Sequence, residues 1–241
     1  MKISTNTKLI KRNARIGQIT SLTALGILAA GMYITFKNPA AVGYSLGALI
    51  AGFFLSQIGM YYGNRWGRSP RPDELIDKGL KGLGREFTIY HYSTPIPHFL
   101  LGPSGLWVLL HYYQGGSISY INKRWRQKGG GLIQGYLKLF GQENIGRPEF
   151  ESVAQIDSLK KYFNKKLPDI EIPEIHGVAL FSNPNAELEL TEAPLPAMKP
   201  KEFKELLKQN SKDKILPQST LKAIQDLLPK ADSESVKESA S

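Results

Sequence analysis

The chain opens with two long stretches of apolar and small residues, and the pattern of a soluble domain begins only beyond them. Residues 16–36 and 40–62 contain no charged residue. Each stretch has the roughly 20 residues that an α-helix needs to cross the hydrocarbon core of a bilayer. The turn Lys37-Asn38-Pro39 between them is too short to hold a domain. The pattern therefore predicts an antiparallel pair of transmembrane helices over residues 16–64.

Two alternatives fit the apolar stretches less well. A signal peptide has a shorter apolar region and no second span. A buried hairpin of a soluble protein has a polar face, and neither stretch carries a charged one. Tyr61, Tyr62 and Trp66 stand where the second helix is expected to leave the bilayer, as interfacial aromatic residues do. We therefore expect an integral membrane protein.

Basic residues are distributed unequally around the helix pair. Its two outer ends are flanked by eight of them, in a basic N-terminus over residues 1–15 and a basic linker over residues 65–72: Lys2, Lys8, Lys11, Arg12, Arg15, Arg65, Arg68 and Arg71. The turn has only Lys37. Positive charge favours the cytoplasmic side. The sequence thus predicts cytoplasmic termini and a cytoplasmic soluble domain, and we expect the plasma membrane of a prokaryote.

Small residues recur every four positions along the second apolar stretch, at Gly43, Gly47 and Ala51. Such spacing lets helix backbones approach closely in lipid. It fits packing within the helix pair, or a homodimer formed through this face. No acidic or basic residue lies in the middle of either stretch, which argues against a transporter or a proton relay.

Residues 73–228 have the alternating patterns of an α/β domain. Helical spacing predicts helices over residues 73–83, 150–167, 201–208 and 219–228, the second with an apolar stripe of Val153, Ile156, Leu159 and Phe163. Strand-like runs cover residues 86–92, 98–101, 105–113, 117–121 and 177–182, and the Gly-Pro-Ser-Gly turn over residues 102–105 predicts a hairpin of the second and third. The order of these elements predicts a mixed sheet. Glycine-rich residues 129–146 read as a loop, and the polar tail over residues 229–241 is expected to be disordered.

Composition narrows the chemistry. The 241 residues include no cysteine, which excludes disulfides, thiolate catalysis and zinc sites built on sulfur. The net charge of +10 suggests an anionic partner, either nucleic acid or lipid headgroups. The strongest local cluster follows Tyr120 and consists of one aromatic and four basic residues: Lys123, Arg124, Trp125, Arg126 and Lys128. It could contact nucleic-acid phosphates, contact anionic lipid, or be plain solvated charge.

Residues 96–116, IPHFLLGPSGLWVLLHYYQGG, resemble the core of the nuclease-related domain (NERD) family. The family's Gly-Pro-x-Gly turn is matched by Gly102, Pro103 and Gly105, and its strand histidine by His98. Residues 176–184, HGVALFSNP, are similar to a later strand of the family. Trp125 and Glu74 are each similar to a single family position. The resemblance spans roughly residues 73–207. It implies a restriction-endonuclease-like fold, in which an aspartate and a glutamate hold a divalent cation and a lysine activates water.

The chain departs from this pattern at the catalytic positions. Pro97 stands at the aspartate position, and Leu110 and Tyr112 stand where the family has Glu-x-Lys. The resemblance therefore implies a membrane-tethered, catalytically inactive module that binds or scaffolds, without a cofactor. One alternative is a Mg²⁺-dependent membrane-anchored nuclease whose ligands have relocated to Glu74 and Glu151. Another is a structural membrane component whose soluble domain binds a protein partner.

The four histidines give no catalytic pattern. His98 and His111 fall on neighbouring predicted strands, which is typical of partly buried strand residues. His91 and His176 have no ligand-like spacing with any acid.

Overall fold

The chain consists of two compact units. The computed structural model describes residues 1–129, 145–213 and 216–230. One unit is Thr7–Arg71, and the other combines Met1–Asn6 with Pro72–Ser241. The sequence boundaries differ from these at the N-terminus, because the first six residues belong to the α/β unit rather than to a separate basic segment. The predicted loop over residues 129–146 and the predicted tail fall largely outside the described residues.

The helical unit contains two helices that are long and apolar enough to cross a membrane. Helix α1 (Thr7–Lys37) begins well before the predicted apolar stretch, and its first two turns carry most of the basic N-terminal residues. Asn38 caps the short helix η1 (Pro39–Ala41), which leads into α2 (Val42–Tyr62) and the π-helical turn η2 (Gly63–Gly67). Only 11% and 6% of the most apolar windows are buried, so the apolar side chains face outward. That exposure argues against a soluble buried hairpin.

The two helices meet along a seam of small residues with alternating three- and four-residue spacing. A Cβ on Gly52 would overlap Leu28, and one on Gly59 would overlap Ser21. Gly31 packs against Ala48 in the same way. Such spacing is that of a coiled-coil seam, and small residues allow the close approach. The hydroxyl of Ser45 on α2 adds a hydrogen bond of 2.9 Å to the Gly31 carbonyl on α1.

The small residues singled out in the sequence lie off this seam. Gly43, Gly47 and Ala51 are all exposed, and a Cβ on either glycine would meet nothing within 4 Å. The part of the prediction that placed them within the helix pair is therefore wrong. Gly47 and Ala51 each come one residue before a seam residue, Ala48 or Gly52, and one residue is a rotation of about 100° around the helix, so their side faces outward.

A six-stranded mixed sheet forms the centre of the α/β unit, as predicted. Its order is β1-β2-β3-β4-β7-β9. The strands are β1 (Lys2–Thr5), β2 (Thr88–His91), β3 (His98–Gly102), β4 (Gly105–Tyr112), β7 (Ile175–Phe181) and β9 (Ala197–Met198). Strands β2, β3 and β4 are antiparallel, and the predicted hairpin at the Gly-Pro-Ser-Gly turn is confirmed by the pairing of Gly102 with Gly105. Strands β1, β7 and β9 add parallel pairings.

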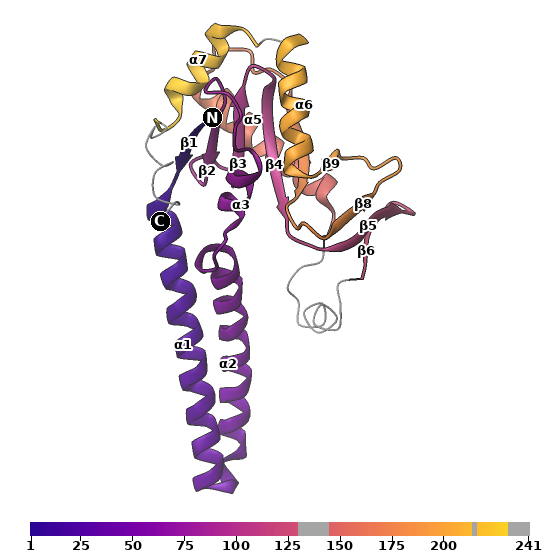
Figure 1. Cartoon of the computed structure of the whole chain (residues 1–241). Helices are drawn as coiled ribbons and strands as arrows, with labels where there is room; N and C mark the ends of the chain where they lie inside the picture. The colour runs from indigo at the N-terminus through magenta and orange to yellow at the C-terminus, as the bar shows by residue number, and fades with distance from the viewer. Residues whose placement is uncertain (130–144, 214–215, 231–241) are drawn as a thin grey trace. The chain divides into compact units, whose positions relative to one another are not determined.

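Helices cover both faces of this sheet (Figure 1). On one face, α5 (Pro148–Lys166) and α7 (Gln218–Leu227) contribute Leu159, Phe163 and Ile224 to an apolar core. On the other, α3 (Pro72–Gly79) and α6 (Pro200–Asp213) contribute Ile76 and Phe203 to a second core. Alternate residues of β4 enter the two cores, as the pleat of a strand requires.

A second sheet of three strands has the order β6-β5-β8. Strand β5 (Gly116–Ile121) pairs antiparallel with β6 (Arg124–Lys128) and parallel with β8 (Ala186–Glu189). Sequence reasoning missed β1, β6, β8 and β9, which are short and mostly lie at sheet edges. It also placed Val153 in the apolar stripe of α5, whereas that side chain is exposed and Ser152 is buried in its stead against Gly177.

Candidate functional site

Leu110 and Tyr112, which the sequence resemblance aligns with a Glu-x-Lys pair, lie on β4, facing α5. Leu110 is 3% exposed and belongs to the apolar core on that face. Its neighbour across the parallel pairing is Ala179, which is fully buried. The packing therefore excludes water from Leu110 and leaves no group there that could hold an ion.

Tyr112, two residues along β4, is a hydrogen-bond donor and carries no positive charge. Its hydroxyl donates to the Glu151 carboxylate on α5 over 3.1 Å, and its ring stacks on Phe181. Burial, together with the adjacent Glu151 carboxylate, raises the pKa of the Tyr112 phenol well above its ordinary value. The phenol therefore stays protonated and acts as a donor, so it can neither ligate a cation as phenolate nor take a proton from water.

Two further carboxylates, those of Glu149 and Glu74, are occupied or remote. Glu149 accepts a hydrogen bond of 2.9 Å from the indole of Trp125. Glu74 lies on α3, and α3 and α5 cover opposite faces of the sheet, so Glu74 and Glu151 are not brought together. Among the described residues there is no group of three histidines, aspartates or glutamates arranged to hold a metal ion. The side chains of Leu110 and Tyr112 therefore do not fit the divalent cation that the resemblance implies.

Pro97 lies immediately before β3, in the loop that joins it to β2. Its carbonyl accepts a hydrogen bond of 2.8 Å from the Tyr92 amide. Because proline has no amide hydrogen, the strand can begin only after it, at His98. The position therefore serves the loop and offers no side-chain oxygen to a site.

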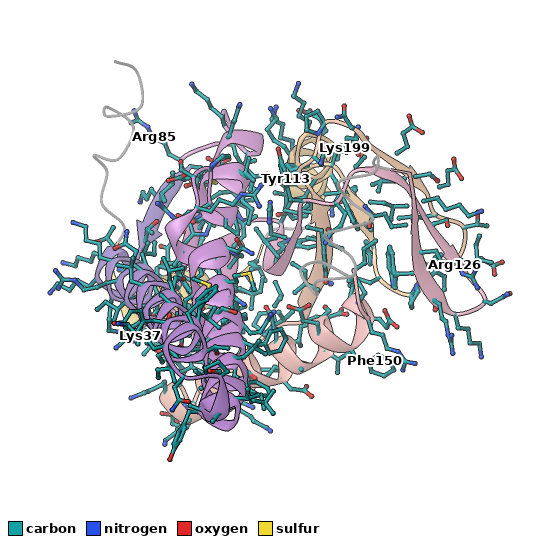
Figure 2. The ribbon with its side chains drawn as sticks, turned by 90° about the horizontal axis from the view of Figure 1, so that it is seen from below. Lys37, Arg85, Tyr113, Arg126, Phe150 and Lys199 are labelled. Carbon is teal, nitrogen blue, oxygen red and sulfur yellow. The ribbon has the colours of Figure 1, made fainter. Side chains whose placement is uncertain are left out.

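The basic cluster of the sequence forms the outer face and turn of a β-hairpin, β5–β6, which we call the basic hairpin. Asn122 and Lys123 have φ of 53° and 57°, as a two-residue type I′ turn requires. Arg124, Arg126 and Lys128 are exposed and lie on one face of β6, since they alternate along the strand. Figure 2 shows Arg126 projecting from the rim of the domain. The alternation of residues 117–128 around Asn122-Lys123 is the signal that could have revealed this hairpin.

Trp125 points the opposite way and is separated from the four basic side chains. It is 9% exposed, with its ring 5.5 Å from Tyr120 and 6.4 Å from Phe181. Together with the bond to Glu149, these contacts make Trp125 the anchor that holds the hairpin to the rest of the unit. The expectation that its ring shares a contact surface with the basic residues does not hold in the fold, because neighbouring strand residues face opposite sides.

Sequence reasoning also missed Arg147. A hollow of about 350 Å³ lies between the basic hairpin and the start of α5. Its described lining has three basic side chains among apolar and polar ones: Lys123, Arg124, Trp125, Gln127, Ile145, Gly146 and Arg147. Arg147 extends the positive surface of the hairpin to the start of α5.

A buried polar network on the opposite face of the sheet was not predicted. The Nδ1 atoms of His91 and His98 lie 2.8 Å apart, and His91 Nε2 lies 3.0 Å from the Asp77 carboxylate. The tautomers of the two rings decide which nitrogen donates in each of these contacts. The strand pairing of His91 with His98 follows from the β2–β3 register. Asp77 reaches them only because α3 folds over the sheet.

This network holds the segment from which the chain leaves the sheet toward α1. The Asn6 amide donates to the His91 carbonyl over 3.0 Å, and the Asn6 side chain donates to the Tyr92 carbonyl over 3.2 Å. Nearby, burial lowers the pKa of His111 to about 4, and Asp73 opposes that shift. The arrangement is a structural clamp that fastens α3 and the end of β1 to the sheet.

The comparisons with known proteins provide no relative. The chain matches no protein-family model, no curated protein and no solved structure. The class of protein is therefore defined by its architecture alone. It has a pair of long apolar helices joined to a mixed-sheet α/β unit with an exposed basic hairpin.

Proposed function

We propose that this protein is a membrane-tethered, catalytically inactive module of the nuclease-related type that binds a phosphate-bearing partner. The observation that carries the proposal is the state of the two β4 positions. Leu110 is sealed in the apolar core, and the phenol of Tyr112 is bonded to Glu151. Hydrolysis of a phosphodiester needs a hydrated cation held by close carboxylates, and the described residues on this face supply no such pair.

A restriction-endonuclease-like fold is part of this proposal. The residues that resemble the family's core fall on β3, β4 and β7, which are consecutive neighbours in the sheet. Strands β4 and β7 run parallel, with α5 between them along the chain. This arrangement supports the resemblance at the elements that would carry the family's site.

The same proposal places the helix pair across a prokaryotic plasma membrane with both termini cytoplasmic. Support comes from the outward apolar surface of α1 and α2 and from the basic residues at their outer ends. Both ends of the helix pair continue directly into the α/β unit, so that unit remains on one side of the membrane.

Binding is assigned to the basic hairpin. Its four cationic side chains are exposed, and no ion pair with them is found among the described residues. Side chains of this kind contact phosphate oxygens without reading a base sequence.

The test is an assay of the purified full-length chain in detergent for cleavage and binding. We expect no cleavage of DNA or RNA with Mg²⁺ or Mn²⁺ above that of a preparation carrying Glu74→Ala and Glu151→Ala. Metal-dependent cleavage that either substitution abolishes would establish a nuclease with relocated ligands. A chain that neither cleaves nor binds nucleic acid or anionic lipid would overturn the proposal and favour a protein partner.

A further inference from the structure

The turn of the basic hairpin combines positive charge with an exposed apolar side chain. Ile121 and Arg124 are paired across the turn, and Ile121 is 46% exposed. Lys123 occupies the turn itself. An exposed isoleucine at the turn does not help to bind the phosphates of nucleic acid. A membrane interface, in contrast, binds both the apolar side chain and the cations beside it.

The outer face of the hairpin offers no ring for a base to stack on. Tyr120 and Trp125 are paired on the inner face, with Trp125 buried. Proteins that bind single strands without sequence preference rely on such rings as well as on charge. Only the electrostatic part of that mode is present.

Acidic side chains limit the positive surface to one strand and its turn. Across the three-stranded sheet, Glu187 is aligned with Ser117 and Lys128, and Glu189 is aligned with Ser119 and Arg126. Adjacent strands are about 4.8 Å apart, so each carboxylate stands about 10 Å from the basic strand. A duplex laid over this face would meet both glutamates, whereas a plane touched by the turn meets Ile121, Lys123 and Arg124.

We propose that the basic hairpin contacts the anionic headgroups of the membrane that holds the helix pair, with Ile121 entering the interface. This inference rests on the proposed function and names its partner as anionic phospholipid. The two peptide connections at Asn6 and Arg71 keep the unit near the headgroups, so the contact is intramolecular in effect and can be weak for each residue. Each basic side chain near such a surface favours contact by about fivefold.

The absence of cysteine permits a direct test on the whole chain. Asn122→Cys, labelled with an environment-sensitive fluorophore, reports the surroundings of the turn after reconstitution in lipid nanodiscs. We expect the label to move to an apolar environment, shielded from an aqueous quencher, in discs that contain phosphatidylglycerol but not in discs of phosphatidylcholine alone. Added salt should reverse the shift.

Substitutions separate this contact from the general effect of charge. The double variant Lys123→Gln, Arg124→Gln should lower the ratio of docked to free hairpin about 25-fold. Its matched control removes the same charge from the exposed side of α5: Lys160→Gln and Lys161→Gln. Ile121→Ser should reduce the apolar shift of the label while the salt dependence remains.

Three results would overturn the inference. The label could remain in water in both kinds of disc, it could shift equally in both, or the control double variant could have the same effect as the hairpin double variant. A label that does not respond to lipid but responds to an added oligonucleotide would also overturn the inference. The proposed phosphate-binding function would remain. Metal-dependent cleavage, in contrast, would remove the proposed function itself.

Discussion

The clearest consequence of the fold concerns Leu110, which the sequence resemblance aligns with a glutamate. The side chain is 3% exposed and surrounded by the apolar core between β4 and α5. A glutamate introduced there would lose its hydration without gaining a partner. Fully buried glutamates have pKa values of about 8 to 9, roughly 4 units above the ordinary value near 4.3. At about 1.4 kcal/mol for each unit, the charged form destabilises the fold by about 5 kcal/mol.

The sign of the pH dependence follows from the proton balance. Between the unfolded pKa near 4.3 and the raised folded pKa, the native state of Leu110→Glu holds a proton that the unfolded state has released. The free energy of unfolding should therefore fall by about 1.4 kcal/mol for each pH unit from about pH 5 upward. Urea unfolding of the full-length chain in detergent, followed by tryptophan fluorescence at pH 5 and pH 8, measures this slope.

Leu110→Gln is the matched control, because it has nearly the same shape and no titrating group. It should be destabilised to the same extent at both pH values. A Leu110→Glu protein as stable at pH 8 as at pH 5 would refute the reasoning. It would mean that the position opens to water as a metal site does, and it would return the nuclease alternative to consideration.

Three further predictions use the same chain. In intact cells, Lys2→Cys should resist an impermeant thiol reagent and Asn38→Cys should react with it, because the positive ends are expected inside; labelling of Lys2→Cys would reverse the orientation. Gly59→Leu should separate the helix pair, since a Cβ at residue 59 overlaps α1. Gly47→Leu should leave the pair intact and weaken only a homodimer formed through the outer face. Cross-linking of paired cysteines in membranes measures both the helix pair and the homodimer. The His111 pKa of about 4 lies below the unfolded value of about 6.5, so the free energy of unfolding should fall by up to about 3 kcal/mol as the pH drops from 6.5 to 4. His111→Phe should remove this dependence, and unfolding curves at pH 4.5 and 7.5 measure it.

The parts of the fold that were predictable depend on information local to the chain. The β3–β4 hairpin is confirmed at its turn because Gly105, with φ of 122°, and Pro103 specify that geometry within four residues. The mixed sheet followed from the order of the elements. Strands β1, β8 and β9 carry no such signal, since each has two to four residues and becomes a strand only by pairing with a distant neighbour.

The candidate site divides in the same way. The identities of Pro97, Leu110 and Tyr112 show without a structure that these positions offer no carboxylate and no lysine. That Tyr112 bonds to Glu151, 39 residues away, was not visible. The alternation around Trp125 was readable in principle. Without β6 as a strand, however, the tryptophan could not be assigned to the inner face.

The sequence by itself determined that two helices are long and apolar enough to cross a membrane, and that Pro97, Leu110 and Tyr112 offer neither a carboxylate nor a lysine. The first is a property of composition and length, and the second is a property of residue identity. Only the tertiary structure decided which surfaces are used. It turned Gly52 and Gly59 inward and Gly47 outward, and it brought Asp77 to His91. The direction of a side chain depends on the register of its element against a partner, and that register is set by packing between residues remote in the chain.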